Sequence, residues 1–205
     1  MAVVKNYDNV AAFVLAGGAS SRMGRDKALL ELDGVPMIVR MARLAEPHVA
    51  SVTLVGPPER YAHLGLCVVA DRWQGTGPLG GIVTALGVSE SHWNLILGCD
   101  LPYLTAEWLV WLIARTLDSS AQAVVPESRR GLEPLAAMYR KDCALAFSTA
   151  LEQGVRRISE ALGEIVFEKV TAGQWRELGS TDMIFHNVNT PKDFAEAQRR
   201  IATSL

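Results

Sequence analysis

The chain has 205 residues, 49% of them hydrophobic, which is enough apolar side chain for the core of a globular domain. Its 20 Lys and Arg are offset by 22 Asp and Glu, and the net charge of -2 argues against a broad nucleic-acid-binding surface. No apolar run reaches the roughly 18 residues of a membrane helix, and residues 1–8 lack a signal-peptide pattern. We therefore expect a single cytoplasmic domain over residues 1–205, with no membrane or nucleic-acid partner.

Apolar runs alternate with segments of helical periodicity, a pattern typical of a doubly wound α/β sheet. The predicted strands are Phe13–Ala16, Val52–Val55, Cys67–Ala70, Asn94–Leu97, Ala123–Val125, Leu135–Tyr139 and Ile165–Lys169. The predicted helices are Pro36–Ala45, a helix ending near Leu86, Ala106–Leu117 and Pro191–Ile201. Thr105 and Thr190 are suited to cap the last two of these helices. We expect a mostly parallel, mixed sheet flanked by helices.

The segment from Leu15 to Leu30 is the most informative part of the chain. A buried apolar run ends there in Gly17 and Gly18, whose small size lets the backbone approach a ligand closely. Backbone N–H groups exposed in such a turn form a concavity that binds anions. Positive charge follows from Arg22, Arg25 and Lys27. This arrangement predicts a binding site for a triphosphate.

The glycine spacing of this segment fits neither common phosphate loop. After Gly18 the next glycine is Gly24, followed by Arg25, so the Gly-Lys-Ser/Thr ending of the P-loop is missing. The adjacent Gly17-Gly18 pair also breaks the G-x-G-x-x-G spacing of the dinucleotide fold. A nicotinamide-dependent dehydrogenase is therefore disfavoured.

Two aspartates follow apolar strands at the points where these strands are predicted to end. Asp100 follows Leu95–Cys99 and precedes Leu101-Pro102, and Asp71 follows Cys67–Ala70. Ligands of such sheets collect at the carboxyl ends of the strands, where a carboxylate can hold Mg²⁺ beside a phosphate. The alternative is that both aspartates only accept hydrogen bonds from nearby backbone N–H groups in turns.

Further candidates lie in two loops. The loop from Gly75 to Ile82 leads into a helix, and its glycines leave room for a base or ribose. Asn187 and Asn189 are two apart in a predicted extended segment, so both side chains point the same way and could bind a polar heterocycle. Each loop also has a plain structural explanation, as a flexible helix entry and as the start of the final helix.

The motifs of this chain resemble those of the molybdenum cofactor guanylyltransferases, a branch of the nucleotidyltransferase superfamily. The resemblance rests on Leu15-Ala16-Gly17-Gly18, Arg22-Met23-Gly24, Asp26-Lys27-Ala28-Leu29, Cys99-Asp100-Leu101-Pro102 and Asn187-Val188-Asn189-Thr190-Pro191. It extends from Phe13 to the last helix. It implies a Rossmann-like nucleotidyltransferase fold and transfer of GMP from GTP to the terminal phosphate of molybdopterin.

The resemblance also implies roles for individual residues. Lys27, Arg22 and the Gly17-Gly18 backbone would hold the β and γ phosphates, Asp100 would bind Mg²⁺, and Asp71 would position the nucleoside. The nucleotide site would further include Leu15, Ala16, Gly77 and Gly80. The acceptor site would include Asn187, Asn189, Arg156 and Arg157, although the two arginines also suit a solvated helix end.

Two segments depart from the family pattern. Gly56-Pro57-Pro58 stands where several relatives have a polar side chain that reaches the nucleotide, and Arg129-Arg130-Gly131 to Glu133-Pro134 resembles the family only loosely. Because the second segment matches only loosely, the resemblance supports the nucleotide more strongly than the acceptor. Alternatives are cytidylyl transfer, a different phosphorylated acceptor, and a non-catalytic protein that delivers the pterin to apo-enzymes. As a guanylyltransferase, the chain would have molybdoenzyme maturation proteins as its partners.

Overall fold

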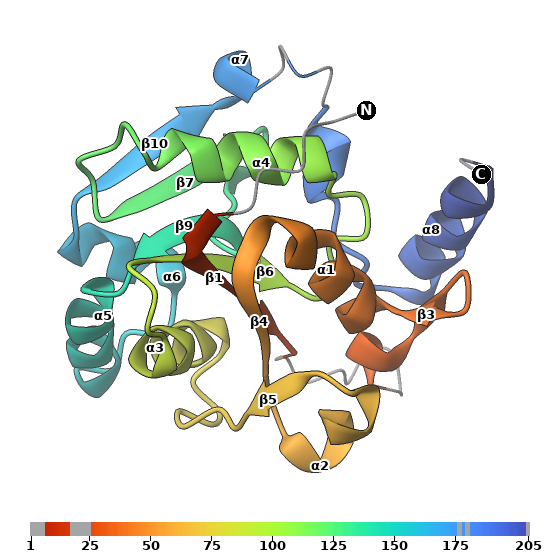
Figure 1. The fold of residues 1–205 in the computed structure, drawn as a ribbon, viewed down its shortest axis with the longest axis horizontal. Coiled ribbons are helices and arrows are strands. Elements are labelled where there is room, and N and C mark those ends of the chain that lie inside the picture. Colours follow the sequence, from red (N-terminus) through yellow and green to blue (C-terminus); the bar gives the residue numbers. More distant parts are fainter. Residues whose placement is uncertain (1–6, 17–25, 176–177, 179–180, 204–205) are drawn as a thin grey trace.

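The computed structural model describes residues 7–16, 26–175, 178 and 181–203, and within them eight strands form one mixed sheet (Figure 1). The strand order is β10-β7-β9-β6-β1-β4-β5, and β8 pairs with β7. The strands are β1 (Tyr7–Leu15), β4 (Val49–Val55), β5 (Cys67–Val69), β6 (Trp93–Gly98), β7 (Ala123–Ser128), β8 (Gly131–Leu132), β9 (Ala136–Arg140) and β10 (Phe167–Thr171). Antiparallel pairing occurs at β8 and β9, and the other pairs are parallel. The predicted mixed, mostly parallel sheet is confirmed.

Helices cover both sides of this sheet. They are α1 (Met37–Ala45), α2 (Pro58–Tyr61), α3 (Pro78–Val88), α4 (Ala106–Arg115), α5 (Cys143–Glu152), α6 (Ile158–Ala161), α7 (Ala172–Trp175) and α8 (Pro191–Thr203). Short 3-10 helices are η1 (Lys27–Leu29), η2 (Glu46–His48), η3 (Ala62–Leu64), η4 (Leu162–Glu164) and η6 (Asp182–Phe185), and β2 (Glu31–Leu32) and β3 (Val35–Pro36) form a separate hairpin. Among the described residues, no helix is long and apolar enough to cross a membrane.

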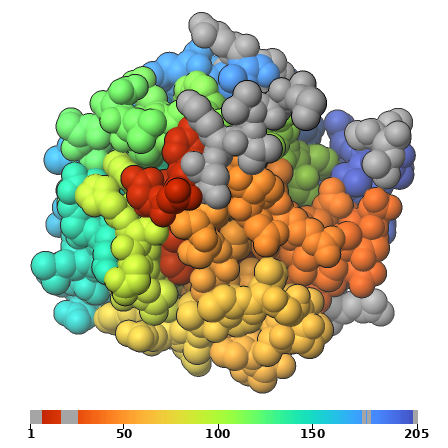
Figure 2. All heavy atoms as spheres, viewed as in Figure 1, coloured from red at the N-terminus to blue at the C-terminus, as the bar shows by residue number. Residues whose placement is uncertain are grey.

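Strict alternation along the central strands divides the core into two layers. In β1, Val10, Ala12 and Val14 face the layer that contains α1 and α4, whereas Phe13 and Leu15 face the layer that contains α3 and α5. Figure 1 shows these helix pairs on opposite sides of the sheet. In the space-filling view of Figure 2, red atoms of β1 are visible between α1 and α3, because the start of this strand is exposed while residues 10–15 are buried. A strand that is covered on both faces has a continuous run of apolar residues in its sequence.

The predicted elements agree with the structure to within a few residues except at the start of β1, and the short elements α2, α6, α7, β2, β3 and β8 were not predicted. Strand β1 begins at Tyr7 rather than Phe13, and its pairing with β4 shifts register between Tyr7 and Ala11. Helix α5 was not predicted, although its buried residues Cys143, Phe147, Ala150 and Leu151 follow the i, i+4, i+7, i+8 spacing of a helical face. That signal was present in the sequence.

The carboxyl ends of four parallel strands meet along one edge of the sheet. Leu15 at the end of β1 pairs with Gly98 of β6 on one side and with Val55 of β4 on the other. The N–H of Gly56 donates to the carbonyl of Val69, which ends β5 (2.9 Å). Residues that follow β6, β1, β4 and β5 are therefore brought side by side, and the site lies along this edge.

Candidate active site at the carboxyl edge of the sheet

A lysine and an aspartate form the centre of this edge. Lys27 Nζ lies 2.7 Å from Asp100 Oδ2, and each side chain is 16% exposed. Lys27 comes from η1 and Asp100 from the turn after β6, so the contact joins residues 73 positions apart. Because β6 lies directly beside β1, the acid after β6 reaches the lysine that follows β1. At this burial the pair is screened less than a surface ion pair.

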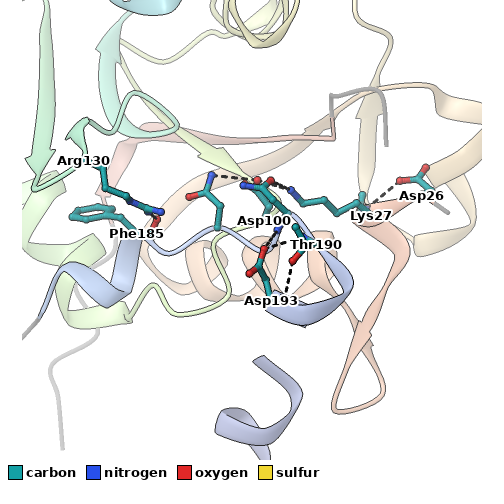
Figure 3. Close-up of polar contacts among 10 residues, drawn as sticks. Asp26, Lys27, Asp100, Arg130, Phe185, Thr190 and Asp193 are labelled. Carbon is teal, nitrogen blue, oxygen red and sulfur yellow. Dashed lines mark hydrogen bonds and ion pairs between the residues drawn. The ribbon is translucent and has the colours of Figure 1, made fainter. Parts of the chain in front are cut away.

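Both asparagines of the Asn187-Val188-Asn189 segment contact this pair (Figure 3). Lys27 Nζ donates to Asn189 Oδ1 (2.7 Å), and Asn187 Nδ2 donates to Asp100 Oδ2 (3.3 Å). Between them, buried Val188 donates its N–H to the carbonyl of Asp100 (2.9 Å). The alternation predicted for an extended segment thus directs the two amides to one side and the valine into the core.

The second predicted carboxylate, Asp71, makes local contacts. Its Oδ1 accepts hydrogen bonds from the N–H of Trp73 (2.9 Å) and from the hydroxyl of Thr84 (2.8 Å). Thr84 is buried in α3 and also accepts from the N–H of Arg72 (3.0 Å), so it ties the end of β5 to that helix. These contacts match the turn interpretation of Asp71, and its nucleotide role stays a prediction. The contact of Thr84 with Asp71 was not predicted, although a single hydroxyl in an otherwise apolar helix indicates that this side chain has a polar partner.

The predicted nucleotide-side glycines frame the entry to α3. Gly77 caps the helix with φ 75°, a conformation that favours glycine. A Cβ at Gly80 would lie 2.1 Å from Thr76 Oγ1 and 2.8 Å from the backbone oxygen of Trp73, so only glycine fits there. Leu15 and Ala16 lie at the edge itself, where Leu15 accepts from the N–H of Cys99 (3.3 Å) and Ala16 donates to Val55 (2.9 Å).

The remaining predicted residues are not brought to the Lys27–Asp100 pair by the described contacts. Arg156 Nη1 donates to the carbonyls of Leu151 (2.8 Å) and Val155 (2.9 Å) and so caps the end of α5. Arg157 lies 3.5 Å from Glu160 and its side chain is 80% exposed. These contacts match the helix-end interpretation, and an acceptor role for either arginine stays a prediction. Gly17, Gly18 and Arg22 lie outside the described residues.

The hairpin of β7 and β8 borders the segment that contains Asn187 and Asn189. Its sequence resembles the family only loosely. Arg130, in the turn from β7 to β8, donates from Nη2 to the carbonyl of Phe185 (Figure 3). Glu133 accepts from the Ser128 hydroxyl (2.6 Å), and its pKa is raised mainly by burial, with a small contribution from the charge of Asp100. Arg130 therefore anchors the segment that carries Asn187.

The oxygen atoms around the Lys27 ammonium are of the kind that bind hard cations, and the ammonium is not placed to act as a nucleophile. The ammonium already sits between a carboxylate and an amide oxygen, the ligand types that divalent cations take from proteins. Within the described residues no group of three His, Cys, Asp or Glu is placed to hold a metal, so an ion at Asp100 would need phosphate or water oxygens as well. Burial raises the pKa of neighbouring Cys99 to about 12, which keeps it a thiol at neutral pH.

Comparison with known proteins identifies the family and the fold of the chain. The family model described as "MobA-like NTP transferase domain" matches residues 12–166. A Nostoc protein named "Probable molybdenum cofactor guanylyltransferase" is 38% identical over 93% of this chain and 91% of its own length. A Pelotomaculum thermopropionicum protein of the same name is 33% identical over 90% of each chain. The fold resembles molybdopterin-guanine dinucleotide biosynthesis protein A from Archaeoglobus fulgidus, with TM-score 0.82, 24% identity and coverage of 95% of this chain and 100% of that one.

Proposed function

Because the chain belongs to the MobA-like NTP transferase family, we propose that it transfers GMP from GTP to the terminal phosphate of molybdopterin and releases pyrophosphate. The observation that carries the proposal is the contact of Lys27 with both Asp100 and Asn189. It joins the end of the glycine segment, the acid after β6 and the asparagine segment at one point. A phosphate-binding cation, a metal-binding acid and a polar acceptor contact are thereby available together.

The reaction requires little covalent help from the protein. An oxygen of the acceptor phosphate forms a bond to the α-phosphorus of GTP, and the bond from that phosphorus to the oxygen bridging it to the β-phosphate breaks. The nucleophile is already anionic at neutral pH, so it needs no general base. The obstacle is repulsion between two anions, which positioned positive charge reduces. A charge about 4 Å from a phosphate contributes roughly 4 kcal/mol at an effective dielectric constant near 20, before desolvation is subtracted.

Each residue then has a chemical task. Lys27 and Arg22 bind the β and γ phosphates together with the Gly17-Gly18 backbone, and Asp71 orients the nucleoside. Asp100 holds Mg²⁺, which when bound supplies positive charge against the phosphate oxygens. Asn187 and Asn189 hold the pterin side of the acceptor. The cytoplasmic location and the molybdoenzyme maturation partners are part of the same proposal.

Calorimetric titration with GTP, CTP, ATP and NAD⁺, each with and without Mg²⁺, tests the proposal. We expect binding of GTP in preference to the others, strengthened by Mg²⁺, followed by pyrophosphate release when molybdopterin is added. Preference for CTP would reassign the chain to cytidylyl transfer. Binding of GTP and molybdopterin without pyrophosphate release would favour a delivery protein.

Replacing Lys27 tests the phosphate role separately. Lys27→Ala removes a charged hydrogen-bond donor, and we expect the GTP dissociation constant to rise about tenfold or more. The control is Lys141→Ala, because Lys141 is 46% exposed and its ion-pair contact is with Glu90, at 3.9 Å. An unchanged dissociation constant in Lys27→Ala would remove this residue from the phosphate site.

A further inference from the structure

The segment after β4 departs from the family pattern, and it is connected to Lys27 through the contact of Tyr61 with Asp26. Gly56-Pro57 is followed by α2, and α2 ends at Tyr61, a tyrosine that is 1% exposed. A Cβ at Gly56 would lie 2.8 Å from Tyr61 Cε2 and 3.0 Å from the Cβ of Ala16. Glycine at this position lets the ring pack against the carboxyl edge beside the end of β1.

The hydroxyl of this buried ring holds the residue before Lys27. Tyr61 donates to Asp26 Oδ2 (2.8 Å), and Asp26 Oδ1 accepts from the N–H of Ala28 (3.1 Å). Asp26 thereby caps η1, in which Lys27 is the first residue. Lys27 thus lies between Asp26, whose carboxylate is held by Tyr61, and Ala28, whose N–H is bound by the same carboxylate. These contacts hold the backbone from which the lysine side chain extends to Asp100.

The other partner of Asp26 contributes less. Arg60 Nη1 lies 3.5 Å from Asp26 Oδ2, and its side chain is 62% exposed, so the contact is long and screened. Burial and the Asp26 carboxylate both raise the pKa of Tyr61, so its hydroxyl keeps the proton at neutral pH. Tyr61 therefore acts as a permanent donor to Asp26.

We propose that Tyr61 is a positioning residue for the triphosphate: through Asp26, its hydroxyl sets where the Lys27 ammonium lies. The inference rests on the proposed role of Lys27 in phosphate binding. It also accounts for the Gly56-Pro57-Pro58 departure. In this chain the segment after β4 takes a different role. Through Tyr61 it orients Lys27, and Lys27 binds the nucleotide. The cost of losing the hydroxyl should appear in nucleotide affinity, because a lysine with more freedom loses more conformational entropy on binding.

The test is a double-mutant cycle on the GTP dissociation constant, measured by calorimetry with Mg²⁺. The variants are Tyr61→Phe, Lys27→Ala and the double substitution. We expect Tyr61→Phe to weaken binding roughly threefold to tenfold, the range set by loss of one hydrogen bond. In the Lys27→Ala background the same substitution should have no further effect, because the lysine that it positions is absent.

A matched control removes the same atom elsewhere. Tyr139 is also fully buried, in the other core layer, and its hydroxyl donates to the carbonyl of Pro134 (2.9 Å). Tyr139→Phe should leave GTP affinity unchanged, while thermal unfolding checks that both variants remain folded.

The outcomes separate this inference from the proposed function. Weakening by Tyr61→Phe that disappears in the Lys27→Ala background supports the positioning role. Equal weakening in both backgrounds would mean that the hydroxyl only stabilises the fold, and no weakening would also overturn the inference while leaving the phosphate role of Lys27 intact. If Lys27→Ala itself binds GTP normally, the proposed function of that lysine fails first.

Discussion

At the scale of residues, the site depends on one partly exposed pair rather than on a buried nucleophile. Lys27 and Asp100 keep contact with solvent, and the neighbouring thiol of Cys99 is held protonated by burial. Because both side chains are mostly buried, the cost of removing the two charges from water offsets much of their attraction, so the net contribution of the pair to folding is small. Its groups are therefore available to a ligand that offers a phosphate to the lysine and a cation to the aspartate.

Asp100→Ala should separate activity from folding. We expect turnover to fall roughly 100-fold or more, since the variant loses the group that would hold the charge-stabilising ion. The midpoint of thermal unfolding should remain within a few degrees of the parent, because the side chain is not part of the core. Pyrophosphate release and a thermal scan measure the two effects. Near-normal turnover would remove Asp100 from the mechanism.

At the scale of elements, two of the three glycines in α3 have opposite requirements. Gly80 faces Trp73 and Thr76 so closely that a Cβ cannot be placed without moving backbone, whereas a Cβ at exposed Gly87 would meet nothing within 4 Å. Helix propensity alone treats both positions alike and favours alanine at each. Tertiary contact with the loop before the helix decides between them.

Alanine at these two positions should therefore change the free energy of unfolding in opposite directions. We expect Gly80→Ala to lower it by about 1–3 kcal/mol through overpacking. Gly87→Ala should raise it by up to about 1 kcal/mol, because alanine loses less conformational entropy in a helix. Urea unfolding of both variants is the measurement, and a stabilising Gly80→Ala would show that the loop adapts without cost.

The final helix, α8, begins with a reciprocal cap. Asp193 Oδ2 accepts from the N–H groups of Asn189 (3.0 Å) and Thr190 (2.8 Å), and Thr190 Oγ1 accepts from the N–H of Asp193 (3.2 Å). The hydrogen bond from Asn189, followed by those from Thr190, lowers the pKa of Asp193 below its usual range. The cap also fixes the backbone of Asn189, whose side chain reaches Lys27.

This cap should make part of the stability depend on pH. Because the pKa of Asp193 is lower in the folded state, its contribution is complete above the unfolded value near 4 and is lost as the pH falls through the folded value. We expect Asp193→Ala to cost about 1 kcal/mol at pH 7 and progressively less below pH about 4. Urea unfolding of both proteins across this range measures the difference, which a constant cost at every pH would contradict.

At the scale of the whole molecule, the segment from η6 to α8 is fastened to the core at several points. Phe185 is fully buried and packs edge-on against two tryptophans, with its ring centroid 5.1 Å from that of Trp108 and 5.4 Å from that of Trp175. Arg130 binds its carbonyl, and two residues later Asn187 reaches Asp100. The segment proposed to bind the acceptor is therefore positioned by the core layer around α4, across the sheet from α3.

Phe185→Ala should weaken both the fold and this side of the site. Removing the ring leaves a cavity between two tryptophans, and we expect a loss of about 3–5 kcal/mol in the free energy of unfolding. Acceptor affinity should fall more than GTP affinity, because the asparagine segment loses its anchor. Tryptophan fluorescence in urea measures the first effect. Leu145→Ala, at a side chain that is 76% exposed, is the control and should change stability little.

Local patterns in the sequence were sufficient to predict the main elements and the placement of several site residues. An apolar run that stops at Asp100-Leu101-Pro102 identifies a strand end, and Asn187 and Asn189 share a side because extended backbone alternates. Periodicity also predicted the helices α1, α3, α4 and α8. It missed α5, although the spacing of that helix was visible, and the one-turn helices α2, α6 and α7 were not predicted. Such patterns depend only on neighbours in the chain, so they can be interpreted before the fold is known.

Which predicted residues meet was decided only by the tertiary structure. Asp100 and Asp71 follow similar strands, yet β6 lies beside β1 and β5 lies two strands away, so Asp100 contacts Lys27 while Asp71 binds Thr84. The contact of Tyr61 with Asp26 joins residues 35 positions apart and has no local signature. Strand order and such long-range contacts follow from packing two core layers at once, and that is a property of the whole chain rather than of any segment.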